Sequence, residues 1–152
     1  MNAEVRLRIK ALLNMLGMGD VELPNEPVVS LSIDDKLTIN IGMTDNSQII
    51  TFFSSVGKLV EGDFLQAKQL LSNNLFNAQF PPMLTAIDDM SNDIILWTQL
   101  NLGNTDDAEL FQLLEAYINK VEEQVQTVET GNEPSLEQSQ APTMNTTFGV
   151  KV

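Results

Sequence analysis

Hydrophobic residues along this chain follow two periodicities, one typical of helices and the other of strands. In the first segment, Val5, Ile9 and Leu12 recur at spacings of three and four residues, which places them on one face of a helix. Later, Leu37 and Ile39 alternate with polar neighbours, as expected of a half-buried strand. Together the patterns predict helices at Ala3–Leu16, Asp63–Phe76 and Asp106–Val128, and strands at Val29–Ile33, Leu37–Met43, Ile49–Val56, Met83–Ile87 and Ile94–Leu100.

Short polar links join the predicted strands and favour antiparallel hairpins. Asp34-Asp35 and the run 44–47 are turn signals between consecutive strands. Pro81 and Pro82 prevent the second helix from continuing. The predicted fold class is therefore α+β, in the order α-β-β-β-α-β-β-α, with a twisted antiparallel sheet packed by helices.

The apolar periodicity ends near residue 128, and the composition changes there. Residues 129–152 are rich in Ser, Thr, Gln, Asn and Pro. We therefore predict one α+β domain at residues 1–128, followed by a disordered acidic and polar tail at 129–152. Within that tail, Phe148, Val150 and Val152 are either an inert remnant or a short linear motif.

Two of the predicted strands carry apolar side chains on both faces. In the third strand, Ile50 and Phe53 point to opposite sides of the sheet, and in the fifth strand Leu96 and Trp97 do the same. Both faces of such strands need cover, and the helices of one small domain cover one face well. The second face is therefore a candidate surface for a protein partner. Trp97, the only tryptophan, fits either the core or such an interface.

Composition and charge narrow the classes of function. The chain has no cysteine and no histidine, which removes thiolate nucleophiles, imidazole bases and the commonest zinc ligands. Its formal net charge of −13 disfavours binding to nucleic acids and to anionic membranes. No apolar run approaches the ~20 residues that cross a bilayer, and the N-terminus lacks the pattern of a signal peptide. We expect a non-enzymatic cytoplasmic protein without a cofactor or metal.

Paired carboxylates give no support for catalysis or calcium binding. Asp34-Asp35, Asp88-Asp89 and Asp106-Asp107 fall at turns or at a helix start, where capping and turn preferences explain them. Segment 89–100 begins like a calcium loop, but it has Ile94 at the position of the required Gly and Leu100 at that of the required Glu. We therefore predict no catalytic and no metal-binding residues.

Several strings, in their shared order, resemble a known family of protein chaperones. The strings are 31–39, 70–76, 93–100 and 109–118. Their order along the chain is similar to that of type III secretion chaperones of the Tir-chaperone (CesT-like) family. Membership would imply a homodimer in the bacterial cytoplasm. The dimer would hold the N-terminal chaperone-binding segment of a secreted effector soluble and competent for secretion, with the ATPase of the secretion apparatus as a further partner.

The resemblance also implies positions for two interfaces. In the family, the second helix and the neighbouring strand commonly build the dimer interface, while the first helix and the sheet commonly receive the effector. By this resemblance the dimer-interface residues are Leu70, Leu71, Leu75, Phe76, Met83 and Leu84. The effector-binding residues are Val5, Ile9, Leu12, Leu13, Ile39, Ile41, Ile50 and Phe52.

Two alternatives remain open at the level of sequence. One is a regulatory protein-binding module that sequesters a secretion regulator, which would need the same surfaces. The other is a carboxylate-dependent enzyme or metal-binding protein, which would need acidic residues to converge in a pocket away from turns.

Overall fold

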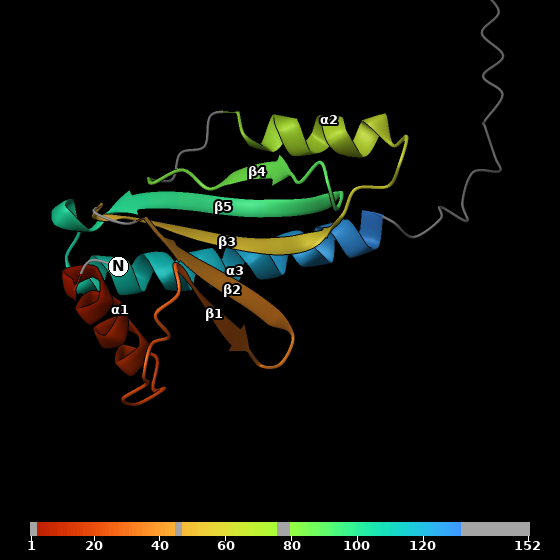
Figure 1. Cartoon of the computed structure of the whole chain (residues 1–152). Helices are drawn as coiled ribbons and strands as arrows, with labels where there is room; N and C mark the ends of the chain where they lie inside the picture. The colour runs from red at the N-terminus through yellow and green to blue at the C-terminus, as the bar shows by residue number, and fades with distance from the viewer. Residues whose placement is uncertain (1–2, 45–46, 76–79, 132–152) are drawn as a thin grey trace, which may run out of the picture.

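The computed structural model describes residues 3–44, 47–75 and 80–131 of the chain and confirms the predicted order of elements (Figure 1). The helices and strands are α1 (Ala3–Met15), β1 (Val28–Ile33), β2 (Leu37–Met43), β3 (Ile49–Lys58), α2 (Phe64–Asn73), β4 (Leu84–Ile87), β5 (Asp93–Asn101), a short 3-10 helix (Leu102–Asn104) and α3 (Asp107–Gly131). The last helix runs slightly past the predicted end at Val128. The predicted tail lies mostly at residues 132–152, outside the described residues.

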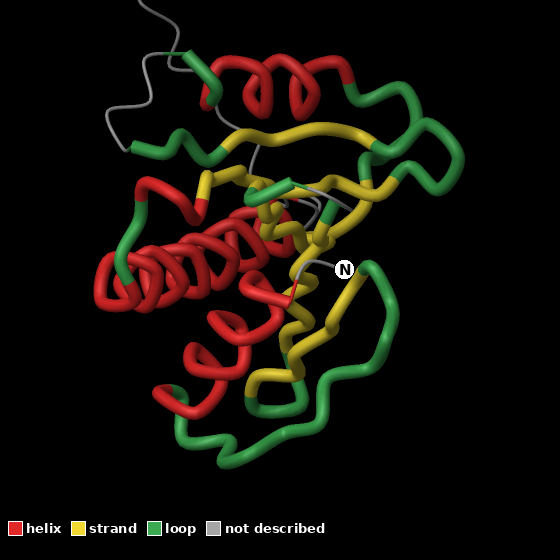
Figure 2. The backbone as a smooth tube through the Cα atoms, turned by 60° about the vertical axis from the view of Figure 1, so that its left-hand side comes forward, coloured by secondary structure: helices red, strands yellow, loops and turns green. Residues whose placement is uncertain are grey.

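The five strands form one antiparallel sheet in the order β1-β2-β3-β5-β4. The pair β3 and β5 is the longest ladder, running from Ile49 opposite Asn101 to Lys58 opposite Asp93, with a β-bulge between Ser55 and Gly57. Figures 1 and 2 show α3 lying across one face of the sheet, while α2 lies along β4 at the sheet's edge. One face is thus covered by α3, and the opposite face is not.

The hydrophobic core lies between α3, α1 and the covered face of the sheet. Strand β3 contributes alternate residues, with Ile50, Phe52 and Val56 all at most 2% exposed. The Phe52 ring lies 5.6 Å from the Tyr117 ring of α3, centroid to centroid, at an interplanar angle of 49°. Such tilted aromatic pairs add about 0.5–1.5 kcal/mol beyond the area they bury. This contact anchors the long last helix on the centre of the sheet.

Tyr117 is the buried polar group that joins the core to the sheet's backbone. Its hydroxyl donates to the Leu96 carbonyl at 2.7 Å, and the hydroxyl oxygen lies 3.2 Å from the Ser54 hydroxyl. Burial raises the pKa of the Tyr117 phenol well above its usual value, although the hydrogen bond with Ser54 opposes part of that rise. The phenol therefore stays neutral in the folded protein, and its polar atom is satisfied.

The uncovered face of the sheet carries the second set of apolar side chains that the strand pattern predicted. Phe53 stands opposite Trp97, and Trp97 stands opposite Leu84, so the three side chains form one row across β3, β5 and β4. All three are half-buried, and Ile49 on the same face is 41% exposed. Trp97 is thus part of a partly exposed row on the uncovered face rather than of the core beneath α3.

Candidate protein-binding surfaces

Helix α2 exposes a stripe of apolar side chains, hereafter the α2 stripe, made of Phe64, Leu71 and the following Leu75. These side chains are 85%, 69% and 66% exposed, respectively. Phe64 and Leu71 are seven residues apart and so lie on one side of the helix, and Leu75 follows in the turn after it. Large apolar side chains clustered in this way on a soluble protein mark a surface that another protein covers.

The start of α2 is fixed by two side-chain hydrogen bonds, one to Asp63 and one to Gln66. Asp63 is the N-cap, and its carboxylate accepts from the Gln66 backbone N–H at 2.9 Å. The Gln66 side-chain oxygen accepts from the Val60 N–H at 3.0 Å. The first bond satisfies a donor that the helix itself leaves unpaired, and the second ties the preceding loop to the first turn of the helix. Together they set the direction in which Phe64 projects.

The end of α2 is attached to the edge of the sheet through one side-chain amide. Asn74 donates from Nδ2 to the Thr85 carbonyl at 2.9 Å and accepts from the Thr85 N–H at 2.8 Å. The amide pairs with β4 much as a neighbouring strand would, and so it blocks the middle of that edge. Helix α2 ends at Asn73, before the predicted end at Phe76. Both ends of the helix are therefore held, and the α2 stripe is presented on a fixed support.

The structure divides the six residues predicted for the dimer interface. Leu71 and Leu75 are exposed on the α2 stripe, and Leu84 is half-buried in the row on the uncovered sheet face. Leu70 and Met83 are 7% and 4% exposed and belong to the chain's own core. Phe76 lies outside the described residues. Phe64 was not predicted for this interface, although it is the most exposed of the large apolar residues in α2. Its seven-residue spacing to Leu71 was the available signal.

All eight residues predicted to bind an effector lie in the core of this chain. Each is at most 2% exposed in the described structure, and the set is Val5, Ile9, Leu12, Leu13, Ile39, Ile41, Ile50 and Phe52. The apolar stripe of α1 faces inward because the sheet and α3 provide the partner for it within the same chain. In this conformation these side chains present no surface to another molecule.

Helix α1 and the loop after it expose a different set of apolar side chains. Leu7, Met15 and Met18 are 68%, 48% and 45% exposed. Strand β1 ends the sheet on this side, and within the described residues no backbone group pairs with its outer edge. An unpaired edge can add the strand of a partner, and flexible methionine side chains accept varied apolar contacts. We call Leu7, Met15 and Met18 the α1 patch.

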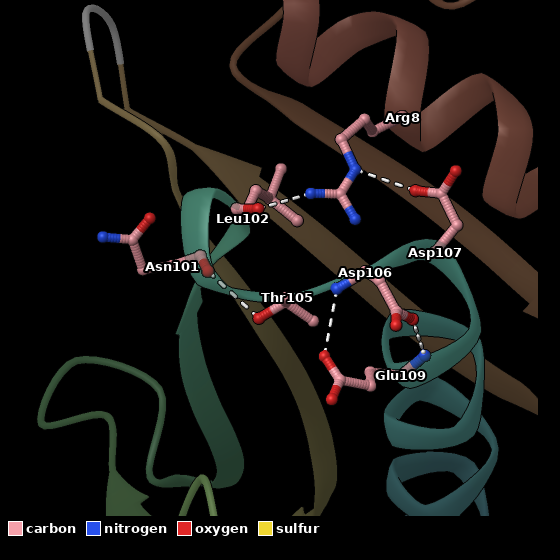
Figure 3. Close-up of polar contacts among 7 residues, drawn as sticks. All are labelled: Arg8, Asn101, Leu102, Thr105, Asp106, Asp107 and Glu109. Carbon is pink, nitrogen blue, oxygen red and sulfur yellow. Dashed lines mark hydrogen bonds and ion pairs between the residues drawn. The ribbon is translucent and has the colours of Figure 1, made fainter.

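Helix α1 is joined to the start of α3 through Arg8 (Figure 3). The guanidinium donates from Nε to Asp107 Oδ1 at 2.8 Å and from a second nitrogen to the Leu102 carbonyl. Asp106 and Glu109 close the adjacent helix start: the Asp106 carboxylate accepts from the Glu109 N–H at 2.8 Å, and the Glu109 carboxylate accepts from the Asp106 N–H at 3.0 Å. The predicted capping role of Asp106 is confirmed. These bonds hold α1, and with it the α1 patch, against α3.

The acidic side chains of the described residues are spread over the surface and do not form a metal site. In the described ranges, no three Asp or Glu side chains come together in a way that could hold a metal ion. No described helix has the length and apolar content needed to cross a membrane. The carboxylate of Asp93, the first residue of β5, has a lowered pKa because the Ser91 hydroxyl and the Lys58 ammonium bond to it. The features that stand out are the apolar surfaces.

Comparison with known proteins gives a family and a fold for this chain. The sequence model of the Tir chaperone protein (CesT) family matches residues 8–124. No curated protein sequence matches the chain. Among solved structures, the chain is similar to the Yersinia pestis type III secretion chaperone SycH in complex with a fragment of YscM2, with 20% identity, a TM-score of 0.61, and coverage of 77% of this chain and 96% of that one.

Two further solved structures share the fold. The ExoT–SpcS complex from Pseudomonas aeruginosa matches with 22% identity, a TM-score of 0.63, and coverage of 81% of this chain and 98% of that one. The HopA1–SchA chaperone–effector complex matches with 9% identity, a TM-score of 0.68, and coverage of 83% and 98%. At these identities the likeness establishes the α+β architecture, and the family match covers most of the described chain.

Proposed function

This chain belongs to the Tir chaperone protein (CesT) family, and we propose that it is a type III secretion chaperone that binds the N-terminal segment of a secreted effector. The observation that carries the proposal is the apolar surface that the chain leaves uncovered on both α1 and α2. A protein client is the occupant that fits, because the surfaces are apolar and lie on opposite parts of the molecule (Figure 1). Such a chaperone acts in the bacterial cytoplasm.

The α2 stripe is the proposed contact with a second copy of the chain. A two-fold interface uses the same patch on both subunits, so Phe64, Leu71 and Leu75 would each be buried twice. The half-buried Leu84 lies on β4, next to α2, and extends the apolar area. Leu70 and Met83 support this surface from within the core and have no direct role in it.

The α1 patch and the outer edge of β1 are the proposed contact with the effector. An extended segment that pairs with β1 presents every second side chain toward the chaperone, where apolar side chains can accept it. The client orders on binding and gives up several kcal/mol in doing so, which the buried apolar area has to offset. The eight buried residues that the resemblance implied for effector binding would act indirectly, by fixing the position of α1 and the sheet.

The test is effector capture by matched variants of the full chain. The protein is co-expressed with the N-terminal segment of the secreted protein that mass spectrometry identifies with it in its native host. Leu7→Ser removes an exposed apolar contact of about 1–2 kcal/mol and should weaken binding about tenfold in calorimetry. Asn14→Ser, on the same exposed side of α1, is the control and should bind as the parent does. Equal binding by both variants, or failure of any such segment to bind, would refute the proposal.

A further inference from the structure

An open cleft separates β2 from β3 at the end of the sheet near the C-terminus of α3. The ladder between these strands runs only from Asn40 opposite Phe53 to Met43 opposite Ile50. Beyond it, residues 37–39 of β2 pair only with β1, and residues 54–58 of β3 pair only with β5. The space between them has a volume of about 520 Å³. We call it the β2–β3 cleft.

The last turns of α3 pack against β3 at the floor of the cleft. Val128 lies so close to Gly57 that a Cβ on Gly57 would come within 2.5 Å of Val128 Cγ1, and Gly57 has a φ of +143°. The bulge between Ser55 and Gly57 shifts the register of β3 at the same place. Val56, which is 2% exposed, and Val125 line the cleft together with Val128. The cleft thus has an apolar floor, and two strand edges border it.

These strand edges are available for pairing. Successive residues of a strand direct their backbone N–H and C=O groups alternately to its two sides, so each of the two stretches carries groups directed toward the gap. Unpaired edges of this kind bind an added strand readily. Thr38, Asn40 and Ser55 line the flanks of the cleft. Lys36 adds positive charge there, whereas Lys58 is paired with Asp93 at 3.2 Å and Glu129 is acidic. An extended segment with alternating apolar side chains and acidic residues beside it would fit.

The chain itself carries such a segment on the C-terminal side of α3. Helix α3 ends at Gly131, and Val128 and Glu129 of its last turn already line the cleft. Residues 144–152 read Met-Asn-Thr-Thr-Phe-Gly-Val-Lys-Val, in which Phe148, Val150 and Val152 alternate with small or polar residues. Period-two alternation is the pattern of a strand with one apolar face. The intervening segment contains Glu133 and Glu137, whose charge is opposite to that of Lys36 at the cleft.

We propose that residues 144–152 dock in the β2–β3 cleft as an added strand of the same chain, with Phe148 and Val150 directed toward Val56 and Val128. Residues 132–143 span roughly 40 Å when extended, at about 3.3–3.6 Å per residue, so they can return the segment to the cleft. The tether supplies an effective concentration on the order of millimolar, which favours this segment over a free competitor. The docked strand covers edges that otherwise invite unwanted pairing.

Cysteine cross-linking tests the proposal directly, because the chain has no cysteine of its own. Ser55→Cys is combined, in the full chain, with one further cysteine in the tail. That cysteine stands at an odd-numbered residue (147, 149 or 151) or at an even-numbered one (148 or 150), and each double variant is oxidised with copper phenanthroline. Ser55 is exposed on the side of β3 away from the floor, so the odd-numbered positions should cross-link at least about tenfold faster than the even-numbered ones. The product should form within one chain at a rate independent of protein concentration.

The matched control moves the acceptor cysteine to Asn104→Cys, exposed near the other end of α3. Helix α3 has 25 residues, which corresponds to roughly 37 Å at 1.5 Å per residue, so this acceptor should cross-link slowly with every tail position. Equal rates at Ser55→Cys and Asn104→Cys, or no dependence on odd and even positions, would overturn the proposal.

Hydrogen exchange provides a second readout that does not depend on engineered thiols. Removal of residues 144–152 should increase exchange at least about tenfold at those amides of residues 37–39 and 54–58 that are directed into the cleft, while the amides directed toward β1 and β5 keep their protection. Phe148→Asp with Val150→Asp should do the same. Asn145→Asp with Thr147→Asp adds the same charge on the opposite face and should leave exchange near that of the parent. Unchanged exchange after truncation would overturn the proposal, and protection of these amides only by an effector fragment would assign the cleft to the client instead.

Discussion

Replacing Leu71 by aspartate should separate the proposed dimer without unfolding the subunit. Leu71 is 69% exposed, so the isolated subunit gains little from its side chain. Burying a leucine completely contributes about 1.5–3 kcal/mol, and the exposed two-thirds therefore corresponds to about 1–2 kcal/mol on association. A two-fold interface loses this amount twice, which gives about 2–4 kcal/mol before the desolvation of two carboxylates is added. The dissociation constant should rise roughly 30- to 700-fold or more.

The assay is a dilution series followed by sedimentation velocity and by light scattering on a sizing column. The parent should have twice the chain mass of 16.8 kDa at concentrations where Leu71→Asp has the mass of one chain. Circular dichroism and thermal unfolding of the variant at low concentration verify that the subunit remains folded. The parent's own melting temperature should fall on dilution, because association stabilises the folded state by mass action.

The matched control is Gln69→Asp, which puts the same charge on the same helix. Gln69 is exposed and lies about 160° around the helix from Leu71, at 100° per residue. Its substitution should leave the dimer intact. If Leu71→Asp associates as tightly as the parent, or if both variants weaken association equally, then the α2 stripe is not the contact between subunits.

The remaining predictions concern the fold that supports the surfaces. Tyr117→Phe should lower the free energy of unfolding by about 1–2 kcal/mol in urea titrations, because the Leu96 carbonyl loses a buried donor. The parent, whose only tyrosine stays protonated when folded, should lose stability above about pH 10, where the unfolded phenol ionises, and the variant should lack that loss. Gly57→Ala should cost about 1–3 kcal/mol through the clash with Val128, and clearly more than Gly62→Ala, which has a positive φ but no atom within 4 Å. Asp106→Ala should cost about 0.5–2 kcal/mol in thermal unfolding, because the start of α3 loses its cap.

The order of elements and the α+β class were predictable because they depend on local periodicity. The alternation in β2 and the helical spacing in α1 each require only neighbouring residues, and both are confirmed with small shifts at the ends. The end of α2 carries a contact that local periodicity does not contain. Asn74, its C-cap, pairs through its side-chain amide with Thr85 of the following strand, and no pattern near residue 74 predicts that contact.

The assignment of side chains to surfaces was harder to predict. Leu70 and Leu71 are adjacent, equally apolar and part of the same string, yet one is 7% and the other 69% exposed. Likewise, the stripe on α1 that was predicted to meet an effector is the stripe that meets the chain's own sheet and α3. An apolar pattern shows that a face must be covered, but it does not distinguish cover by the same chain from cover by another.

By itself, the sequence determined which segments are helices and strands, that two strands are apolar on both faces, and that the chain offers neither thiol nor imidazole chemistry. These properties follow from residue types and from spacings of a few positions. Only the tertiary structure decided which face α3 covers, that Phe64 and Leu71 remain exposed, and that β2 and β3 part beside the end of α3. Each of these depends on contacts between residues far apart along the chain, where packing and the pairing of buried polar groups select one arrangement among many with the same local patterns.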